Sequence, residues 1–346
     1  MLQNGAGALN GECMLPFSLV YHDGFYLPLG AHVFPGEKYK LVHERLLATG
    51  AAAESDFTRP QTIALEDVLR IHERGYVERL IDGTLSEQEI LQMELPYSKA
   101  LVDATLLGCG GTLEAARLAL RDGAACSIGG GFHHAHRDHG EGFCILHDVA
   151  IALAWLLQDG GIERAMVIDL DVHDGNGTAA IFPPAGEHHR RSSGASLQYG
   201  VTSGSSMPSA DGVFTLSMHQ QNNYPAYKPP SSLDVPLADG TDDAEYLEAL
   251  ESALDAAFAH FRPQLIAYVA GADPYVEDKL GGLALTIDGL KQRDRTVFRA
   301  AQSAGAPVFS VYAGGYAMRV EDTVTIHANT VLAAAEVFSF HGATSC

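Results

Sequence analysis

The chain has 346 residues, of which 47% are apolar and 19% are charged, a composition typical of a globular protein with a substantial core. Forty-three acidic residues against 22 Lys and Arg give a formal charge of −21, which excludes nucleic acid as a natural partner and favours cationic, lysine-bearing ones. The five cysteines are scattered without a CxxC pair, which argues against a disulfide framework and favours a reducing, cytoplasmic environment.

Residues 1–13 are expected to form a disordered lead before one domain over residues 14–346. Within that domain, short apolar runs typical of buried strands alternate with segments of helical periodicity. Strands are expected at 18–22, 62–65, 125–128, 165–172, 213–219, 265–270 and 307–312. Helices are expected at 37–48, 66–81, 112–121, 147–158, 242–261, 289–303 and 323–338. This alternation predicts an α/β fold in three α/β/α layers around a mostly parallel sheet.

Residues 183–212 interrupt this alternation. The segment is rich in Gly, Ser and Pro and has no apolar period, so it is expected to be a surface insertion. No run of 18 apolar residues occurs anywhere in the sequence, and no membrane span is expected.

Four of the predicted strands end in unusual sequences. These are GGGFHHAHRDHGEGFC (129–144), DVHDGNG (171–177), GADPYVEDKLGG (271–282) and AGGY (313–316). In open α/β sheets, sites form beyond the carboxyl ends of the strands, where glycines let the backbone approach a ligand closely. Four such ends at one edge predict a pocket there.

The second of these ends carries alternating polar residues. Asp169, Asp171 and His173 alternate with aliphatic residues, so in an extended strand they would face the same side. An internal ion-pair network would explain these three residues alone. Asp273, at another strand end, adds a third buried carboxylate and makes a divalent cation the simplest compensation. Asp171, His173 and Asp273 would leave one coordination position open for water, as in catalytic sites.

Three further side chains could handle protons and charge. His133 and His134 follow three glycines and are better explained as proton handlers than as core histidines. Asp169 could orient one of the two imidazoles. Tyr316 follows two glycines and could donate its hydroxyl to a developing oxyanion, although an ordinary buried tyrosine is the simpler alternative for this residue alone.

With these motifs, in this order, the chain resembles the histone deacetylase superfamily, with its arginase/deacetylase fold, over roughly residues 15–340. The sequence motifs HDGNG and GGFHH are most similar to those of the class IV branch and its bacterial relatives. The resemblance implies Zn²⁺ on Asp171, His173 and Asp273, with Fe²⁺ as an alternative. It also implies His134 as general base and then general acid, His133 paired with Asp169, and Tyr316 polarising the scissile carbonyl.

The resemblance also implies two further groups of residues. One lines a narrow substrate tunnel and comprises Gly142, Phe143 and Gly314. The other would bind K⁺ through the side chains of Asp169 and Ser217 and the carbonyl oxygens of Asp171, His173 and Met218.

Two positions depart from the class I pattern. Asn176 stands where class I enzymes have an aspartate paired with the second histidine, as in the class II and IV branches. The far tunnel wall lacks the class I phenylalanine and instead offers Asn222, Asn223 or Tyr224. This difference favours a pocket that accepts acyl chains longer than acetyl.

The predicted function is a zinc-dependent amidohydrolase that removes acyl groups, acetyl or longer, from lysine side chains of peptides or proteins. An acetylpolyamine amidohydrolase acting on small acylated amines, and a non-catalytic acyl-lysine binding module, remain alternatives. A two-manganese ureohydrolase is disfavoured because Asp273 is preceded by Gly271 and Ala272 and not by a second carboxylate. The sequence leaves the oligomeric state open.

Overall fold

The computed structural model describes residues 15–159, 161–185 and 212–339. The expected lead at 1–13 and most of the expected insertion at 183–212 lie outside these residues. Eight strands form the sheet: β1 (Ser18–Val20), β2 (Phe57–Thr58), β3 (Ala124–Ser127), β4 (Ala165–Asp169), β5 (Val213–Gln220), β6 (Leu233–Leu237), β7 (Leu265–Val269) and β8 (Val308–Val311).

All neighbouring strands of this sheet pair in parallel, in the order β2-β1-β3-β8-β7-β4-β5-β6. The central strands β3, β4, β7 and β8 are buried along their whole length, which explains their near-continuous apolar sequences. The predicted parallel α/β fold is therefore confirmed.

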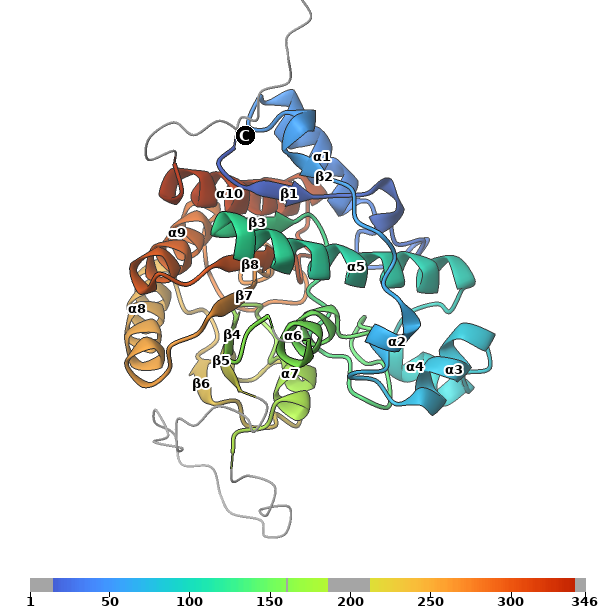
Figure 1. Cartoon of the computed structure of the whole chain (residues 1–346). Coiled ribbons are helices and arrows are strands. Elements are labelled where there is room, and N and C mark those ends of the chain that lie inside the picture. Colours follow the sequence, from blue (N-terminus) through green and yellow to red (C-terminus); the bar gives the residue numbers. More distant parts are fainter. Residues whose placement is uncertain (1–14, 160, 186–211, 340–346) are drawn as a thin grey trace, which may run out of the picture.

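Helices cover both faces of the sheet (Figure 1). They are α1 (Lys38–Ala48), α2 (Leu65–Val68), α3 (Arg74–Asp82), α4 (Glu87–Met93), α5 (Lys99–Asp122), α6 (Asp148–Gln158), α7 (Asn176–Ile181), α8 (Asp243–His260), α9 (Ile287–Ala304) and α10 (Val320–Val337). On one face, α5 packs on β1, β3 and β8 and against α6. On the other, α8, α9, α10 and α1 pack side by side in that order. Within the described ranges, no helix combines the length and apolarity needed to cross a bilayer.

The predicted strand at 62–65 is wrong. Residues 59–64 run as irregular chain along α5, where Ile63 N donates to Leu106 O, and the sheet edge is formed instead by β2. The neighbouring helix also begins at Lys99 and not at residue 112. Its glycines obscured it in the sequence, but a Cβ on Gly110 would collide with the carbonyl of Gln61. Glycine therefore allows the close packing that holds the irregular segment.

Three other elements differ from expectation. The predicted helix at 66–81 is divided into α2 and α3. The edge strand β6 was missed because its sequence, LDVPL, includes a proline, which only an edge strand tolerates well. The strand expected at 165–172 ends at Asp169, so Asp171 and His173 lie in the loop beyond it and not on one face of the strand.

The sheet order places the four unusual strand ends together. β3, β8, β7 and β4 are consecutive in the sheet, and because all are parallel, their carboxyl ends lie at the same edge. Four segments thus converge on one region, as the sequence predicted: 129–144, 313–316, 271–282 and 171–177.

Candidate metal centre

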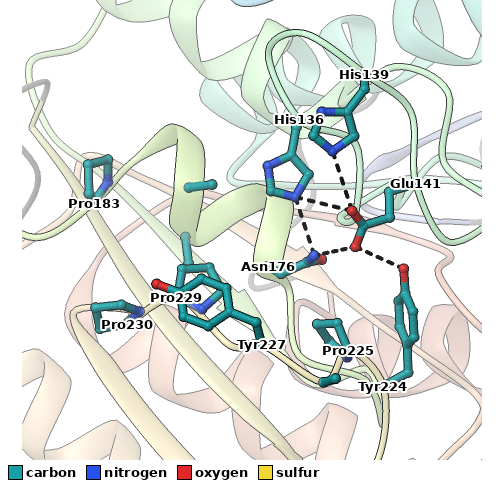
Figure 2. Close-up of a pocket in the computed structure, with 13 residues that line it drawn as sticks. His136, His139, Glu141, Asn176, Pro183, Tyr224, Pro225, Tyr227, Pro229 and Pro230 are labelled. Carbon is teal, nitrogen blue, oxygen red and sulfur yellow. Dashed lines mark hydrogen bonds and ion pairs between the residues drawn. The ribbon is translucent and has the colours of Figure 1, made fainter. Parts of the chain in front are cut away.

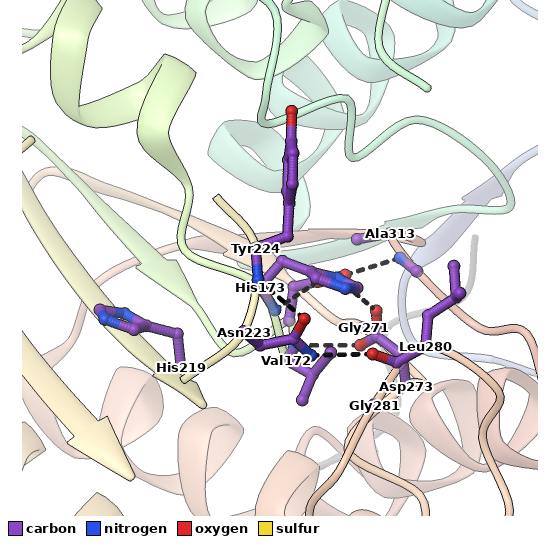
Figure 3. A network of polar contacts seen from close by, with 12 residues as sticks. Val172, His173, His219, Asn223, Tyr224, Gly271, Asp273, Leu280, Gly281 and Ala313 are labelled. Atoms are coloured by element: carbon purple, nitrogen blue, oxygen red, sulfur yellow. Dashed lines mark hydrogen bonds and ion pairs between the residues drawn. The ribbon is translucent and has the colours of Figure 1, made fainter. Parts of the chain in front are cut away.

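Asp171, His173 and Asp273 lie together at this edge. All three side chains are buried, and one ligand atom from each lies within 4.8 Å of the others. Nδ1 of His173 is 3.0 Å from Oδ1 of Asp171 and 3.2 Å from Oδ2 of Asp273 (Figure 3). The two carboxylates come from different strand ends, so the centre joins the loop after β4 to the loop after β7.

Backbone amides hold the two carboxylates in place. Val172 N donates to Oδ1 of Asp273 at 3.0 Å, and Gly314 N donates to Oδ2 of Asp171 at 2.7 Å. Oδ2 of Asp273 is buried and receives no hydrogen bond. Two carboxylates and one imidazole that converge with an unsatisfied oxygen fit a divalent cation such as zinc, with nitrogen and oxygen ligands.

The two adjacent histidines have different partners. Nδ1 of His133 lies 2.8 Å from Oδ2 of Asp169, whereas Nδ1 of His134 lies 2.7 Å from Oδ1 of Asn176. A carboxylate stabilises an imidazolium, while an amide oxygen accepts one N–H and leaves the ring neutral. The pair is therefore built for two different protonation states.

The electrostatic surroundings support the same division. Burial opposes charge on His133, but Asp169 and Asp171 outweigh it and raise its pKa to about 9. Burial, together with His133 and His173, holds the pKa of His134 well below its usual range. At neutral pH His133 is charged and His134 is neutral, with Nε2 free to accept a proton.

A carboxylate lies behind Asn176, and the sequence analysis did not anticipate its role. Nδ2 of Asn176 donates to Oε1 of Glu141 at 2.7 Å (Figure 2). The amide oxygen of Asn176 therefore faces His134. Tyr224 OH donates to the same Oε1 at 2.8 Å, and Nε2 of His139 lies 3.3 Å from Oε2.

Burial alone would raise the pKa of Glu141, but its hydrogen bonds from His139, Tyr224 and Asn176 lower it to about 2. Glu141 is therefore ionised at neutral pH. Its negative charge acts on His134 through the side-chain amide of Asn176. Glu141 and Asn176 together thus replace the aspartate that class I enzymes are expected to have at position 176.

A cavity of about 200 Å³ leads to the centre. Its lining comprises Glu94, His134, Gly142, Phe143, His173, Asn223, Tyr224, Leu280 and Tyr316. The predicted tunnel residues Gly142 and Phe143 are thus in its wall, with Asn223 and Tyr224 on the other side. Gly142 has φ +52°, and a Cβ there would lie 2.8 Å from Cδ2 of His134, so the backbone conformation and the close approach to His134 both favour glycine. Asn222 and Gly314 do not line this cavity, but Gly314 lines a small adjoining space together with Gly142, Phe143 and Tyr316, and its N–H orients Asp171.

Tyr316 lies on the wall of this cavity beside the candidate metal ligands. Its ring centroid is 6.4 Å from that of His173, and its backbone N–H donates to Asp278 at 2.6 Å. Burial and the charges of Asp171 and Asp273 raise the pKa of its phenol well above the usual value. The hydroxyl therefore stays protonated and can act as a hydrogen-bond donor.

Lys38 is a second residue that the sequence analysis did not single out. Its side chain is fully buried, and Nζ donates to Ala313 O at 2.5 Å and lies 5.9 Å from the centroid of Tyr316. Burial lowers the pKa of Lys38 to about 8, although Asp273 and Asp171 oppose this shift. A lysine within a helical pattern gives no sequence signal of such burial.

The two side chains expected to bind K⁺ lie side by side in the sheet, since Asp169 of β4 pairs in register with Ser217 of β5. Both oxygens of Asp169 already have protein partners, His133 and the backbone N–H of Asp171. The hydroxyl of Ser217 contacts Asp174 and His219. Met218 is buried in β5. The K⁺ site stays a prediction.

The fold and this arrangement of buried acids, paired histidines and tyrosine define a hydrolase of the arginase/deacetylase architecture. A family model described as the histone deacetylase domain matches residues 32–332. The chain is 31% identical over 294 residues to histone deacetylase 2 of Arabidopsis thaliana, covering 82% of this chain and 70% of that protein. The chain therefore belongs to the histone deacetylase family.

The chain is also similar to other proteins. An uncharacterized protein of Picosynechococcus is 38% identical over 323 residues, covering 93% of this chain and 99% of that protein. The histone deacetylase-like amidohydrolase of Pseudomonas aeruginosa is 27% identical and is covered over 76% of its length, with 84% of this chain matched. The crystal structure of a histone deacetylase homologue from Aquifex aeolicus matches the fold with a TM-score of 0.72 at 20% identity, covering 92% of this chain and 83% of that one. Family membership supports an enzyme of the deacetylase or amidohydrolase class.

Proposed function

We propose that this protein is a zinc-dependent hydrolase that removes acetyl groups from lysine side chains. The observation that carries the proposal is the joint position of the Asp171–His173–Asp273 group, His134 and Tyr316 at the end of one cavity. A metal ion bound there would supply the Lewis acidity needed to activate water and polarise an amide. The structural homologue solved with the inhibitor SAHA has the same fold, at 22% identity and a TM-score of 0.72.

The chain's own residues would share the remaining chemistry. His134, neutral and with Nε2 free, would take a proton from the attacking water and return it to the leaving amine. The Tyr316 hydroxyl would donate to the carbonyl oxygen as negative charge develops on it. His133, held charged by Asp169, would add a positive charge beside the same region. Asn176 would keep His134 in the tautomer that can accept the proton.

The cavity also fits the alkyl chain of a lysine. Phe143, Tyr224 and Leu280 give it apolar walls, and the formal charge of −21 attracts cationic peptides. An adjoining space that shares Gly142, Phe143 and Tyr316 with this cavity has a volume of only about 10 Å³, and Tyr39 and Phe132 also line it. We therefore favour acetyl over longer chains, contrary to the expectation from the missing tunnel phenylalanine.

A second candidate substrate is an acetylated polyamine. The exposed Glu94 lies in the cavity lining, where its carboxylate could attract a distal ammonium group. Such a contact would suit a small polycation as well as a peptide rich in lysine.

A panel of substrates would test both candidates. Peptides carrying acetyl-, butyryl- and octanoyl-lysine would be compared with acetylated spermidine at equal metal loading. We expect kcat/KM to be highest for the acetyl-lysine peptide and to fall with chain length, because longer chains clash with the closed floor. A higher kcat/KM for spermidine that falls selectively in Glu94→Gln would favour the polyamine, and turnover of none of these would refute the proposed activity.

A further inference from the structure

A second group of potential ligands lies on the other side of the loop that carries His173. It comprises Asp174, which follows His173 directly, His219 of β5 and Asp234 of β6. One ligand atom from each lies within 4.8 Å of the others. Figure 3 shows His219 set apart from His173 and Asp273. The two groups have no residue in common.

The hydrogen bonds within this second group are incomplete. Oδ2 of Asp174 and Oδ1 of Asp234 are both buried and receive no hydrogen bond. The other oxygen of Asp174 is 3.3 Å from Ser217 Oγ and 3.4 Å from Nδ1 of His219, and that of Asp234 accepts from Ser231 N at 2.9 Å. Buried carboxylate oxygens are rarely left without a partner in folded proteins, so these two call for an explanation.

Protein cations do not supply the missing partner. Among the described residues, neither Asp174 nor Asp234 forms an ion pair with Lys or Arg. The neighbouring Lys228 instead donates its ammonium to the carbonyl oxygens of Asn223 and Pro225, each at 2.6 Å. Nδ1 of His219 is 3.4 Å from Oδ1 of Asp174 and 2.9 Å from the hydroxyl of Ser217. Two buried carboxylates without a counter-charge are unfavourable, especially in a chain of charge −21.

We propose that Asp174, His219 and Asp234 bind a second divalent cation. Two carboxylates and one imidazole form a nitrogen and oxygen ligand set suited to Zn²⁺, Mn²⁺ or Fe²⁺. Asp174 and His219 are buried and Asp234 is half-buried, so the ion would lie just beneath the surface with access from the side of β6. None of the three residues lines the cavity of the first centre, so the role of this ion is structural.

Such an ion would stabilise the loop that carries His173 of the first centre. It would tie the loop after β4 to the edge strands β5 and β6, one residue beyond His173. Asp174 N also donates to Tyr224 O at 3.3 Å, which connects the same loop to the wall of the cavity. Metal binding at a site absent from the unfolded chain adds to the stability of the fold. This proposal is independent of the substrate assigned to the enzyme.

Metal stoichiometry tests the proposal on the full chain. The protein would be stripped with a chelator, reloaded with Zn²⁺, desalted, and analysed for zinc and potassium by mass spectrometry. We expect two equivalents of zinc in the wild type and one in Asp234→Asn, which removes a charge at nearly constant shape. Asp255→Asn, an exposed change on α8, is the matched control and should retain two. A wild type that holds one equivalent, unchanged in Asp234→Asn, overturns the proposal, as does potassium in place of the second zinc.

A second measurement remains decisive if Asp234→Asn does not fold. Asp273→Ala disables the first centre and leaves the second intact, so we expect one equivalent of zinc and a melting temperature that rises when zinc is added. Loss of all zinc with no thermal shift would mean that Asp174, His219 and Asp234 bind no metal, and it would overturn the proposal. Hydrolase activity of the wild type is a separate readout, so failure of this proposal is distinguishable from failure of the proposed function.

Discussion

Two groups of identical composition flank the short loop after β4, and they differ in what surrounds them. Asp171, His173 and Asp273 adjoin a cavity of about 200 Å³ whose wall includes His134 and Tyr316. Asp174, His219 and Asp234 have the same residue types, but none of the three is among the described residues that line this cavity with His134 and Tyr316. Ligand type alone therefore does not define a catalytic centre. Access for a substrate and groups that move protons distinguish the first group from the second.

Among substitutions that test the difference between the two groups, the largest effect is expected at Asp273. Asp273→Ala should abolish turnover and remove one equivalent of metal, because only three protein ligands are available at the open centre. Asp234→Asn should also remove one equivalent but retain turnover. Elemental analysis and an acetyl-lysine assay on both variants check this. Substantial turnover in Asp273→Ala would break the assignment of chemistry to the open group.

The proton-handling residues should have the next largest effect. His134→Ala and Tyr316→Phe should retain the metal content of the wild type, since neither residue is a ligand, yet lose turnover. Removal of one donor to a developing oxyanion typically lowers kcat by about 10²–10³-fold. Single-turnover kinetics at matched metal loading give the measurement. A kcat of Tyr316→Phe within a few-fold of the wild type would remove this hydroxyl from the mechanism.

A smaller effect is expected from the carboxylate behind Asn176. Glu141→Gln should lower kcat by about 10- to 100-fold, the usual cost of losing a partner that orients a reacting group. The loss arises because glutamine can present its own amide N–H to Asn176 and allow the Asn176 amide to turn away from His134. Asp138→Asn is the control, since it removes a neighbouring exposed charge that contacts His139 but not Asn176. Equal losses in the two variants would indicate a general charge effect.

The smallest effect is expected at Tyr224. Tyr224→Phe should lower kcat by less than about 10-fold, because Asn176 and His139 still donate to Glu141 when the phenol is absent. The ring stays in place, so KM for an acetyl-lysine peptide should change little. A larger loss than that of Glu141→Gln would show that Tyr224 acts on the substrate directly and not through Glu141.

The sequence predicted the parallel sheet and its functional edge because aliphatic strands and their glycine-rich ends are local patterns. It did not predict β6, whose proline is acceptable only at an edge, or the true start of α5. Those features depend on partners distant in the chain, such as Gln61 against Gly110. The end of β4 at Asp169 was missed for a similar reason. Asp171 and His173 leave the strand to meet Asp273, a contact that alternation along one strand cannot reveal.

The structure brings together the ligand and proton-handling residues predicted from sequence, but the supporting residues were not visible there. Glu141 and Lys38 look like ordinary charged residues in the sequence. Their roles follow from burial and from contacts with Asn176 and Ala313, both made across the fold. Asp174 and Asp234 likewise gain significance only when β5 and β6 bring them to one place. A group of cooperating side chains can be predicted from sequence only when its members lie in recognisable sequence motifs.

One side chain, Tyr224, belongs both to the wall of the cavity and to the hydrogen bonds behind His134. A substrate that presses on this ring also disturbs Glu141, and through Asn176 it alters the support of the base. A poorly fitting acyl group would therefore bind and yet react modestly more slowly, so that this part of the discrimination appears in kcat more than in KM. An inhibitor undergoes no proton transfer. Displacement of the Tyr224 ring would therefore not weaken an inhibitor through its effect on His134. Selectivity for inhibitors and selectivity for substrates are consequently separate properties of this enzyme.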